Sequence, residues 1–132
     1  MALKVGDTAS RTRTVTDQDV RAFAQVTGDV NPIHLDDAYA ATTQFGRRIA
    51  HGMLSAGFIS AVLANDVPGP GAVYLGQDLK FKMPVFIGDT ITTDVEVTSY
   101  REDRRIAILR TTCTNQDGKV VIEGQATALL TK

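Results

Sequence analysis

Apolar side chains in the first part of the chain recur at helical spacing. Thr16 and Asp19 have the spacing of a capping box, and the apolar positions of residues 20–27 follow them, which predicts a helix that ends at Gly28. A second short helix is expected over residues 36–43, because two aspartates stand where a helix N-terminus favours negative charge.

The segment from Gly52 to Asn65 has a different character, since it is apolar on nearly every side of a helix. Such a helix is expected to be buried nearly all round. The following "NDVPGPG" stops it, because two prolines and two glycines cannot continue a helix.

After this helix the pattern changes to a period of two, which is typical of strands. Strands are expected over residues 72–81, 90–98, 106–114 and 120–130, with an N-terminal strand near Ser10 to Val15. Consecutive strands joined by short turns pair antiparallel. The pattern therefore predicts an α+β fold in which one curved sheet wraps around one helix.

Composition and charge narrow the class of protein. With 132 residues, 43% apolar and 22% charged, the chain is expected to form a single domain over residues 1–132. Its 14 basic and 15 acidic side chains give a net charge of -1, which predicts no nucleic-acid partner. The N-terminus has no apolar signal core, residues 49–64 are too polar to span a membrane, and the lone Cys113 favours a reducing compartment. We therefore expect a cytoplasmic protein with no membrane partner.

The stretch "TGDVNPIH", residues 27–34, contains an acid and a histidine that are candidates for catalysis. Asp29 and His34 would lie roughly 140° apart on a helix and on opposite faces of a strand, so only an irregular turn brings them together. Pro32 favours such a turn by pushing Asn31 out of the helical region, and the Asn31 side chain can then bond the neighbouring backbone. An acid–imidazole pair and an ordinary turn both fit this pattern.

His51 and Gly52 stand at the start of the apolar helix, and two interpretations of them remain open. The free N–H groups of Gly52 and Met53 would stabilise a developing negative charge there. Alternatively, His51 caps the helix and Gly52 relieves a steric clash. No metal is expected, because the acids and histidines follow no zinc or calcium spacing. The basic residues Lys80, Lys82, Arg47 and Arg48 are candidates either for phosphate contacts or for exposed positions.

Three segments resemble the MaoC-like hydratases: "TGDVNPIHLDDAYA", "IAHGMLSAGF" and "VYLGQDLKFKMPVFIGD". The similarity runs from about Val5 to Leu130 and is strongest to the short (R)-specific enoyl-CoA hydratases that supply polyhydroxyalkanoate synthesis. It implies a hot-dog fold, with a long central helix wrapped by a five-stranded antiparallel sheet, and a homodimer.

The same resemblance implies a hydro-lyase that needs no cofactor. Its substrate would be a trans-2-enoyl-CoA, an acyl-CoA thioester that reversible hydration converts to (R)-3-hydroxyacyl-CoA. By matching motif positions, the catalytic pair would be Asp29 and His34, and the oxyanion and substrate-binding group would be Gly52, Asn31, Ser60 and His51. For Ser60, a small residue needed for close packing is an equally open interpretation.

Other functions on the same fold remain open. A 3-hydroxyacyl-ACP dehydratase of fatty-acid synthesis would use the same residues on a different carrier. A non-catalytic acyl-thioester-binding module would need the binding tunnel but not both Asp29 and His34. A hot-dog thioesterase is less favoured, because residues 52–63 contain no Asp or Glu.

Overall fold

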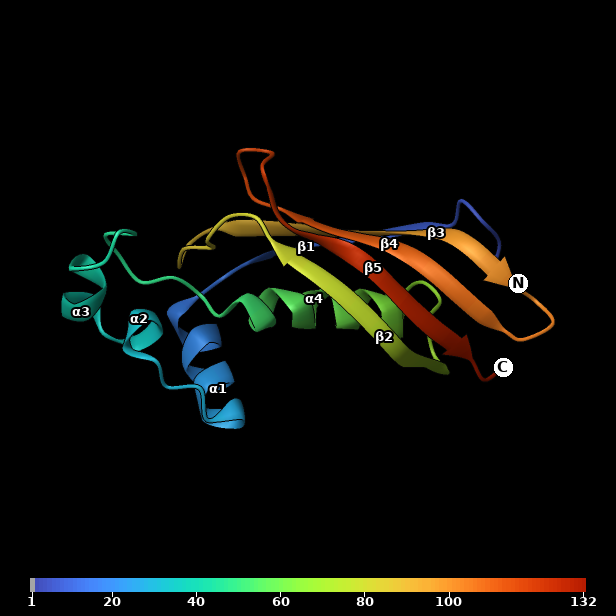
Figure 1. Cartoon of the computed structure of the whole chain (residues 1–132), viewed down its shortest axis with the longest axis horizontal. Helices are drawn as coiled ribbons and strands as arrows, with labels where there is room; N and C mark the ends of the chain where they lie inside the picture. Colours follow the sequence, from blue (N-terminus) through green and yellow to red (C-terminus); the bar gives the residue numbers. More distant parts are fainter. Residues whose placement is uncertain (1) are drawn as a thin grey trace.

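One antiparallel sheet of five strands curves around a single long helix (Figure 1). The structure is a computed structural model that describes residues 2–132. The strand order across the sheet is β1-β3-β4-β5-β2, so β1 and β2 form the two edges. The strands are β1 (Thr8–Thr14), β2 (Ala72–Phe81), β3 (Thr90–Arg101), β4 (Ile106–Thr114) and β5 (Val120–Leu130).

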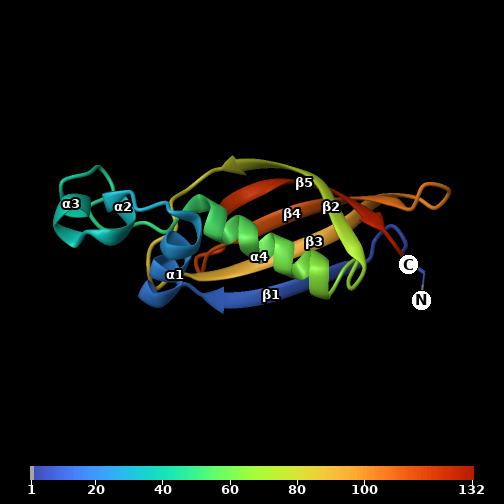
Figure 2. The same cartoon turned by 90° about the horizontal axis from the view of Figure 1, so that it is seen from below.

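The helix α4 (Gly52–Asn65) crosses the concave face of this sheet, as Figure 2 shows from below. Its buried side chains Ile59, Val62 and Leu63 share one core with Val95 of β3 and Leu109 of β4. This arrangement is the hot-dog fold that the sequence predicts. Within residues 2–132, no helix combines the length and the apolar character that crossing a membrane requires.

Three short helices lie together at the end of the sheet where α4 begins, while both chain termini lie at the opposite end (Figure 1). The predicted capping box opens α1 (Asp17–Thr27): Thr16 Oγ1 accepts the Asp19 N–H, and the Asp19 carboxylate accepts the Thr16 N–H, both at 3.1 Å. The helix ends at Gly28, whose φ of 80° is left-handed. Both ends of this helix are therefore confirmed.

The expected helix over residues 36–43 is wrong in its bounds. Within this range only α3 (Asp37–Ala41) forms, and a separate helix that was not expected, α2 (Pro32–Leu35), precedes it. They are separated by Asp36, whose extended backbone ends α2 and whose carboxylate accepts the Tyr39 N–H at 3.1 Å to begin α3. The two aspartates therefore stand at the N-terminus of α3, as predicted, and the helix ends two residues earlier than expected.

Two further expectations need correction. The N-terminal strand ends at Thr14, one residue early, because the Val15 N–H leaves the ladder and donates to Asp89 O at 2.8 Å. The helix α4 is not buried all round by this chain: Met53 is 56% exposed, and Gly57 and Ala64 are exposed as well. The open side of α4 faces the same way as the apolar side chains of the edge strand β2, among which Leu75 is 52% exposed.

Candidate active site

The "TGDVNPIH" stretch folds as the irregular turn that its sequence predicts. Asn31 has an extended backbone (φ -54°, ψ 127°) and caps α2, with its side-chain oxygen accepting the Ile33 N–H at 3.2 Å. Pro32 is the first residue of α2, where its missing N–H costs nothing. The Asp29 carboxylate accepts the Asn31 N–H at 3.3 Å, which fixes the acid against the same turn.

This turn brings Asp29 and His34 together and places His51 beside them. One carboxylate oxygen of Asp29 and one ring nitrogen of each histidine lie within 4.8 Å of one another. Burial increases across the three residues: Asp29 is exposed, His34 is 9% exposed and His51 is 2% exposed. A single water can bridge an oxygen and a nitrogen this far apart, because each of its hydrogen bonds spans about 2.8 Å.

The His34 ring has one nitrogen committed to the protein. Its Nδ1 lies 2.7 Å from Ile49 O, and since a carbonyl only accepts, Nδ1 carries the proton. The other nitrogen, Nε2, then has a lone pair that can accept a proton. Burial lowers the pKa of His34 below its ordinary value and outweighs the raising effect of the bond to Ile49 and of the nearby Asp29 carboxylate. His34 is therefore suited to act as a neutral base.

His51 lies beneath His34. The two rings stack with centroids 3.9 Å apart and planes 29° apart, and Phe23 of α1 packs against His51 at 4.7 Å. His51 Nε2–H donates to Asp29 O at 3.0 Å, and its Nδ1 is buried with no partner among residues 2–132. His51 occupies the N-cap position of α4, as one interpretation of the sequence expected, but its side chain makes no capping hydrogen bond.

The stacking also bears on metal binding. Imidazole lone pairs lie in the plane of the ring. Two rings that lie face to face cannot both aim such lone pairs at one ion between them, even though Asp29, His34 and His51 are close enough together. The donor geometry thus disfavours a shared metal.

Arg48 is a supporting residue that the sequence did not identify. It is 8% exposed, and its Nε–H donates to His34 O at 2.7 Å. The same guanidinium pairs with Asp17 of α1 and lies 3.8 Å from Asp37 of α3. Arg48 is therefore occupied inside the protein, which contradicts its interpretation as a phosphate contact. The sequence "RR" offers no signal to distinguish it from the exposed Arg47, whose guanidinium lies over the Phe86 ring at 3.9 Å.

Gly52 is the first residue of α4 and lines a cavity of about 340 Å³ with Ile49, Phe81, Met83 and Ile122 among its walls. The Phe81 ring packs directly on Gly52: a Cβ built at position 52 would lie 2.6 Å from Phe81 Cε1. The first N–H groups of a helix have no partner within it, so this end of α4 offers donors to a bound oxygen. Gly52 therefore offers a backbone N–H that is unpaired within the helix, and the Phe81 ring is its close neighbour.

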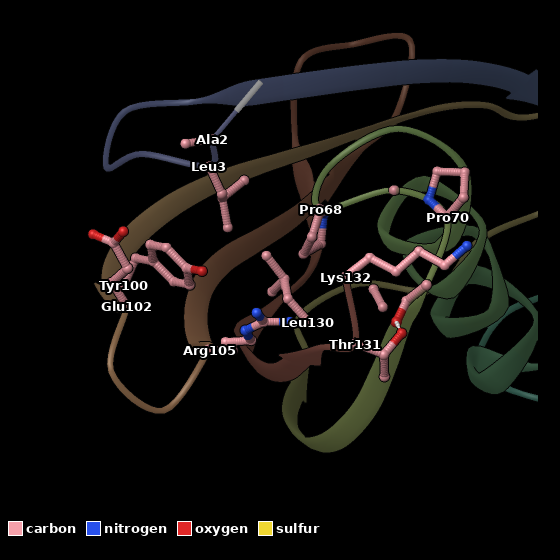
Figure 3. A pocket seen from close by; sticks show the side chains of 13 residues that line it. Ala2, Leu3, Pro68, Pro70, Tyr100, Glu102, Arg105, Leu130, Thr131 and Lys132 are labelled. Atoms are coloured by element: carbon pink, nitrogen blue, oxygen red, sulfur yellow. Dashed lines mark hydrogen bonds between the residues drawn. The ribbon is translucent and has the colours of Figure 1, made fainter.

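The structure does not place Ser60 with the other candidates. It lies two turns along α4 and lines a second cavity, of about 430 Å³, between α4 and β2. Met53, Leu75, Gln77 and Leu79 share this cavity, so it is largely apolar. A separate cavity of about 480 Å³ lies at the far end of the molecule, between the β3–β4 hairpin and the C-terminus, and none of the predicted site residues lines it (Figure 3).

The fold and the site together define a hot-dog protein with an acid–imidazole pair at the N-terminus of its central helix. Residues 4–118 match the MaoC like domain, and the chain belongs to this family. It is 53% identical to the (R)-specific enoyl-CoA hydratase of Rhodospirillum rubrum over 97% of this chain and 88% of that protein. It is 40% identical to a mitochondrial 3-hydroxyacyl-acyl-carrier-protein dehydratase of Solanum lycopersicum over 97% of this chain and 78% of that one.

The comparison with solved structures agrees. The (R)-hydratase from Aeromonas caviae involved in PHA biosynthesis superposes with a TM-score of 0.95 at 47% identity, covering 98% of each chain. The fold prediction and the family resemblance are therefore both confirmed.

The contact between Gly52 and Phe81 gives a prediction about stability. Gly52→Ala is expected to destabilise the protein by about 1–3 kcal/mol, because the new methyl group overlaps the ring. In a Phe81→Ala background the same change is expected to be neutral or stabilising, because alanine is the better helix former and no ring opposes it. Urea unfolding of the parent, both single variants and the double variant measures this coupling.

Gly57→Ala on the same helix is the matched control, because a Cβ there meets nothing within 4 Å. Its effect should be the same with and without Phe81. Additive effects of Gly52→Ala and Phe81→Ala would contradict the steric account.

Proposed function

We propose that this protein is an (R)-specific enoyl-CoA hydratase, a hydro-lyase that adds water reversibly to trans-2-enoyl-CoA and gives (R)-3-hydroxyacyl-CoA. The observation that carries this proposal is the convergence of Asp29 and His34, with Nδ1 of His34 held by Ile49 and Nε2 left as an acceptor. The two relatives with the same activity in their names, at 53% and 47% identity, support it.

In the proposed reaction, Asp29 and His34 hold one water between them. The water oxygen forms a bond to the β-carbon of the enoyl thioester while Asp29 and His34 accept its proton. The electron pair of the double bond moves to the α-carbon and onto the thioester oxygen as an enolate. The accepted proton then returns to the α-carbon, so that water is added in full. Acid–base help of this kind is worth about 10²–10⁴-fold in rate.

The enolate oxygen needs a donor, and we assign this role to the Gly52 N–H at the start of α4. One such donor is worth about 10²–10³-fold. The cavity that Gly52 lines gives the thioester an apolar approach. Asn31 keeps its expected role indirectly, because it holds the turn that carries Asp29 and His34.

The carrier of the acyl group is the principal alternative. The plant relative named as an acyl-carrier-protein dehydratase supports a carrier-protein substrate. Its 40% identity is lower than the 53% and 47% of the relatives named as enoyl-CoA hydratases, which favours CoA. A non-catalytic binding module would give no reason for an acid and a neutral imidazole to meet beside the residue that precedes α4.

The hydratase proposal predicts rapid loss of enoyl-thioester absorbance when the protein is mixed with crotonyl-CoA. Asp29→Asn and His34→Ala are each expected to lower kcat by at least about 10²-fold, because each removes one of the two groups that accept the proton of water. Thermal unfolding of each variant confirms that it is folded.

Asp36→Asn is the matched control for these variants, because Asp36 lies in the same segment but caps α3 and points to no reacting atom. It should retain activity within about twofold, well short of the loss expected for an acid–base group. Coupling the product to (R)- or (S)-specific dehydrogenases determines its stereochemistry. A parent protein that is inactive on short and long enoyl-CoA alike would overturn the proposal, and hydration of enoyl-ACP alone would identify the other carrier.

The pH dependence of kcat/KM follows from the state of His34. The base must be neutral, and burial lowers the pKa of His34. Activity should therefore persist as pH falls through about 6.5, the ordinary value for histidine, and decline only below it. A decline that begins above pH 7 would contradict this account of His34.

We further propose that the protein is a homodimer that forms through β2 and the open side of α4. β2 is an edge strand, and Leu75 on it is 52% exposed. Met53 on α4 adds to the same apolar surface. A second copy related by a two-fold axis would present the same surface in return and would cover the side of α4 that this chain leaves open.

Leu75→Asp is expected to convert the dimer into monomers, because it places a charge in the centre of this surface. Light scattering coupled to gel filtration measures the mass. Val5→Asp, at a 60% exposed valine before β1, is the matched control and should leave the mass unchanged. An unchanged mass for Leu75→Asp would place any interface elsewhere.

We also propose a cytoplasmic location and a role in supplying (R)-3-hydroxyacyl-CoA for polyhydroxyalkanoate synthesis. The buried free thiol of Cys113 supports the first, and the Aeromonas caviae enzyme involved in PHA biosynthesis supports the second.

A further inference from the structure

Residues 49–51 make four contacts with residues 29–34, in addition to the bond from Arg48 to His34 O. Ile49 N–H donates to Ile33 O at 3.3 Å, and His34 Nδ1–H donates to Ile49 O at 2.7 Å. His51 supplies the other two contacts: its Nε2–H donates to Asp29 O at 3.0 Å, and its ring stacks on His34. One residue therefore holds both members of the proposed acid–base pair, the acid through its backbone and the base through its ring.

We infer that His51 is a positioning residue for the hydration, which fixes Asp29 and His34 relative to each other and does not itself touch the substrate. At 2% exposed, the side chain lies under His34, and the Phe23 ring packs against it with the ring centroids 4.7 Å apart. This inference rests on the hydratase function proposed above, and it assigns His51 to the support of the reacting pair. A misplacement of about 1 Å in such a pair costs about 10²-fold in rate.

The identity of residue 51 follows from these two duties. A donor must reach Asp29 O, and a flat ring must cover His34. Glutamine supplies the donor without the ring, because its amide nitrogen lies near the position of Nε2. Phenylalanine supplies the ring without the donor. Histidine supplies both.

The charged surroundings of the pair come from four parts of the chain. Asp29 precedes α2, Arg48 precedes α4 and donates to His34 O, and Asp17 of α1 and Asp37 of α3 pair with Arg48. Phe23 is the apolar neighbour on α1. The His51 imidazole is one of the groups that lower the pKa of His34. Replacing it is therefore expected to raise the pKa of His34 and to move the acid limb of kcat/KM to higher pH.

Kinetics of the two variants separate the two duties. His51→Phe is expected to lower kcat by tenfold or more with KM within about twofold, since the site is loosened but the substrate contacts remain. His51→Gln should recover part of that loss. Phe23→Leu is the matched control, because it loosens the packing under His51 but keeps both of its contacts, and its kcat should fall by less than about threefold, far below the cost of misplacing the pair.

Three kinetic results would overturn the inference. The first is a His51→Phe enzyme with unchanged kcat and acid limb. The second is a raised KM at constant kcat, which would mean that His51 contacts the substrate. The third is a loss in Phe23→Leu as large as that in His51→Phe, which would mean that packing alone matters.

A second measurement needs no activity. The chain has only two histidines, so a tag-free, ¹⁵N-labelled protein gives two sets of imidazole signals that the His51 variants assign. At neutral pH we expect His34 to carry its proton on Nδ1 and His51 on Nε2, because each faces a carbonyl. His51 protonated on Nδ1 instead would overturn the inference. Because the parent protein is used, this result stands even if it hydrates no enoyl thioester and the proposed function fails.

Discussion

The arrangement of this protein depends on a helix that has no polar face. Ile59, Val62 and Leu63 of α4 bury against the sheet, while Met53 and Gly57 on the other side remain apolar and exposed. Such a helix is stable only across a concave sheet and beneath some further cover. The N-terminus of α4 is thereby held at one end of the sheet. Its unpaired N–H groups have fixed positions there, and other segments pack around them.

The site then forms from two stretches of chain that meet at this end. Residues 49–51 lead into α4. The Ala50 N–H donates to Val85 O at 2.7 Å, and this bond fixes the segment. The stretch from Asp29 to His34 lies over it. Arg48 adds a bond from the first segment to the second, at His34 O, and extends the connection to Asp17 of α1. Because every one of these bonds uses a backbone group or a buried side chain, the reacting groups are left free for the substrate.

Local sequence predicted those parts of the structure that are decided by near neighbours. The capping pair of Thr16 and Asp19, the turn at Pro32 and the apolar helix from Gly52 all depend on residues within one or two turns of chain, and all three are confirmed. The stack of His34 on His51 joins residues 17 positions apart, and it depends on the path of the whole segment between them. The pattern likewise gave no sign of the short helix α2 that precedes Asp36.

The parts that could not be predicted share a physical cause. Whether Arg47 or Arg48 turns inward depends on the acids that α1 and α3 present, and Asp17 is 31 residues away from Arg48. The sequence allowed that Gly52 relieves a steric clash, but the Phe81 ring that would cause the clash lies at the end of a distant strand. In each case the deciding partner comes from another element. A pattern along the chain identifies which residues could take part in catalysis or binding. The packing of the helices and strands decides which of those residues lie together.

The burial of His51 has an energetic cost that clarifies what the site requires. A buried acceptor with no partner costs about 1–3 kcal/mol, and Nδ1 of His51 is such an atom among residues 2–132. An apolar residue of similar size would avoid that cost but would lose the donor to Asp29 O. A polar residue without a ring would keep the donor but would open the underside of His34 to water and weaken the burial that lowers the pKa of His34. The imidazole is the side chain that satisfies both needs. The unpaired Nδ1 of His51 is therefore the energetic cost of holding Asp29 and His34 in position.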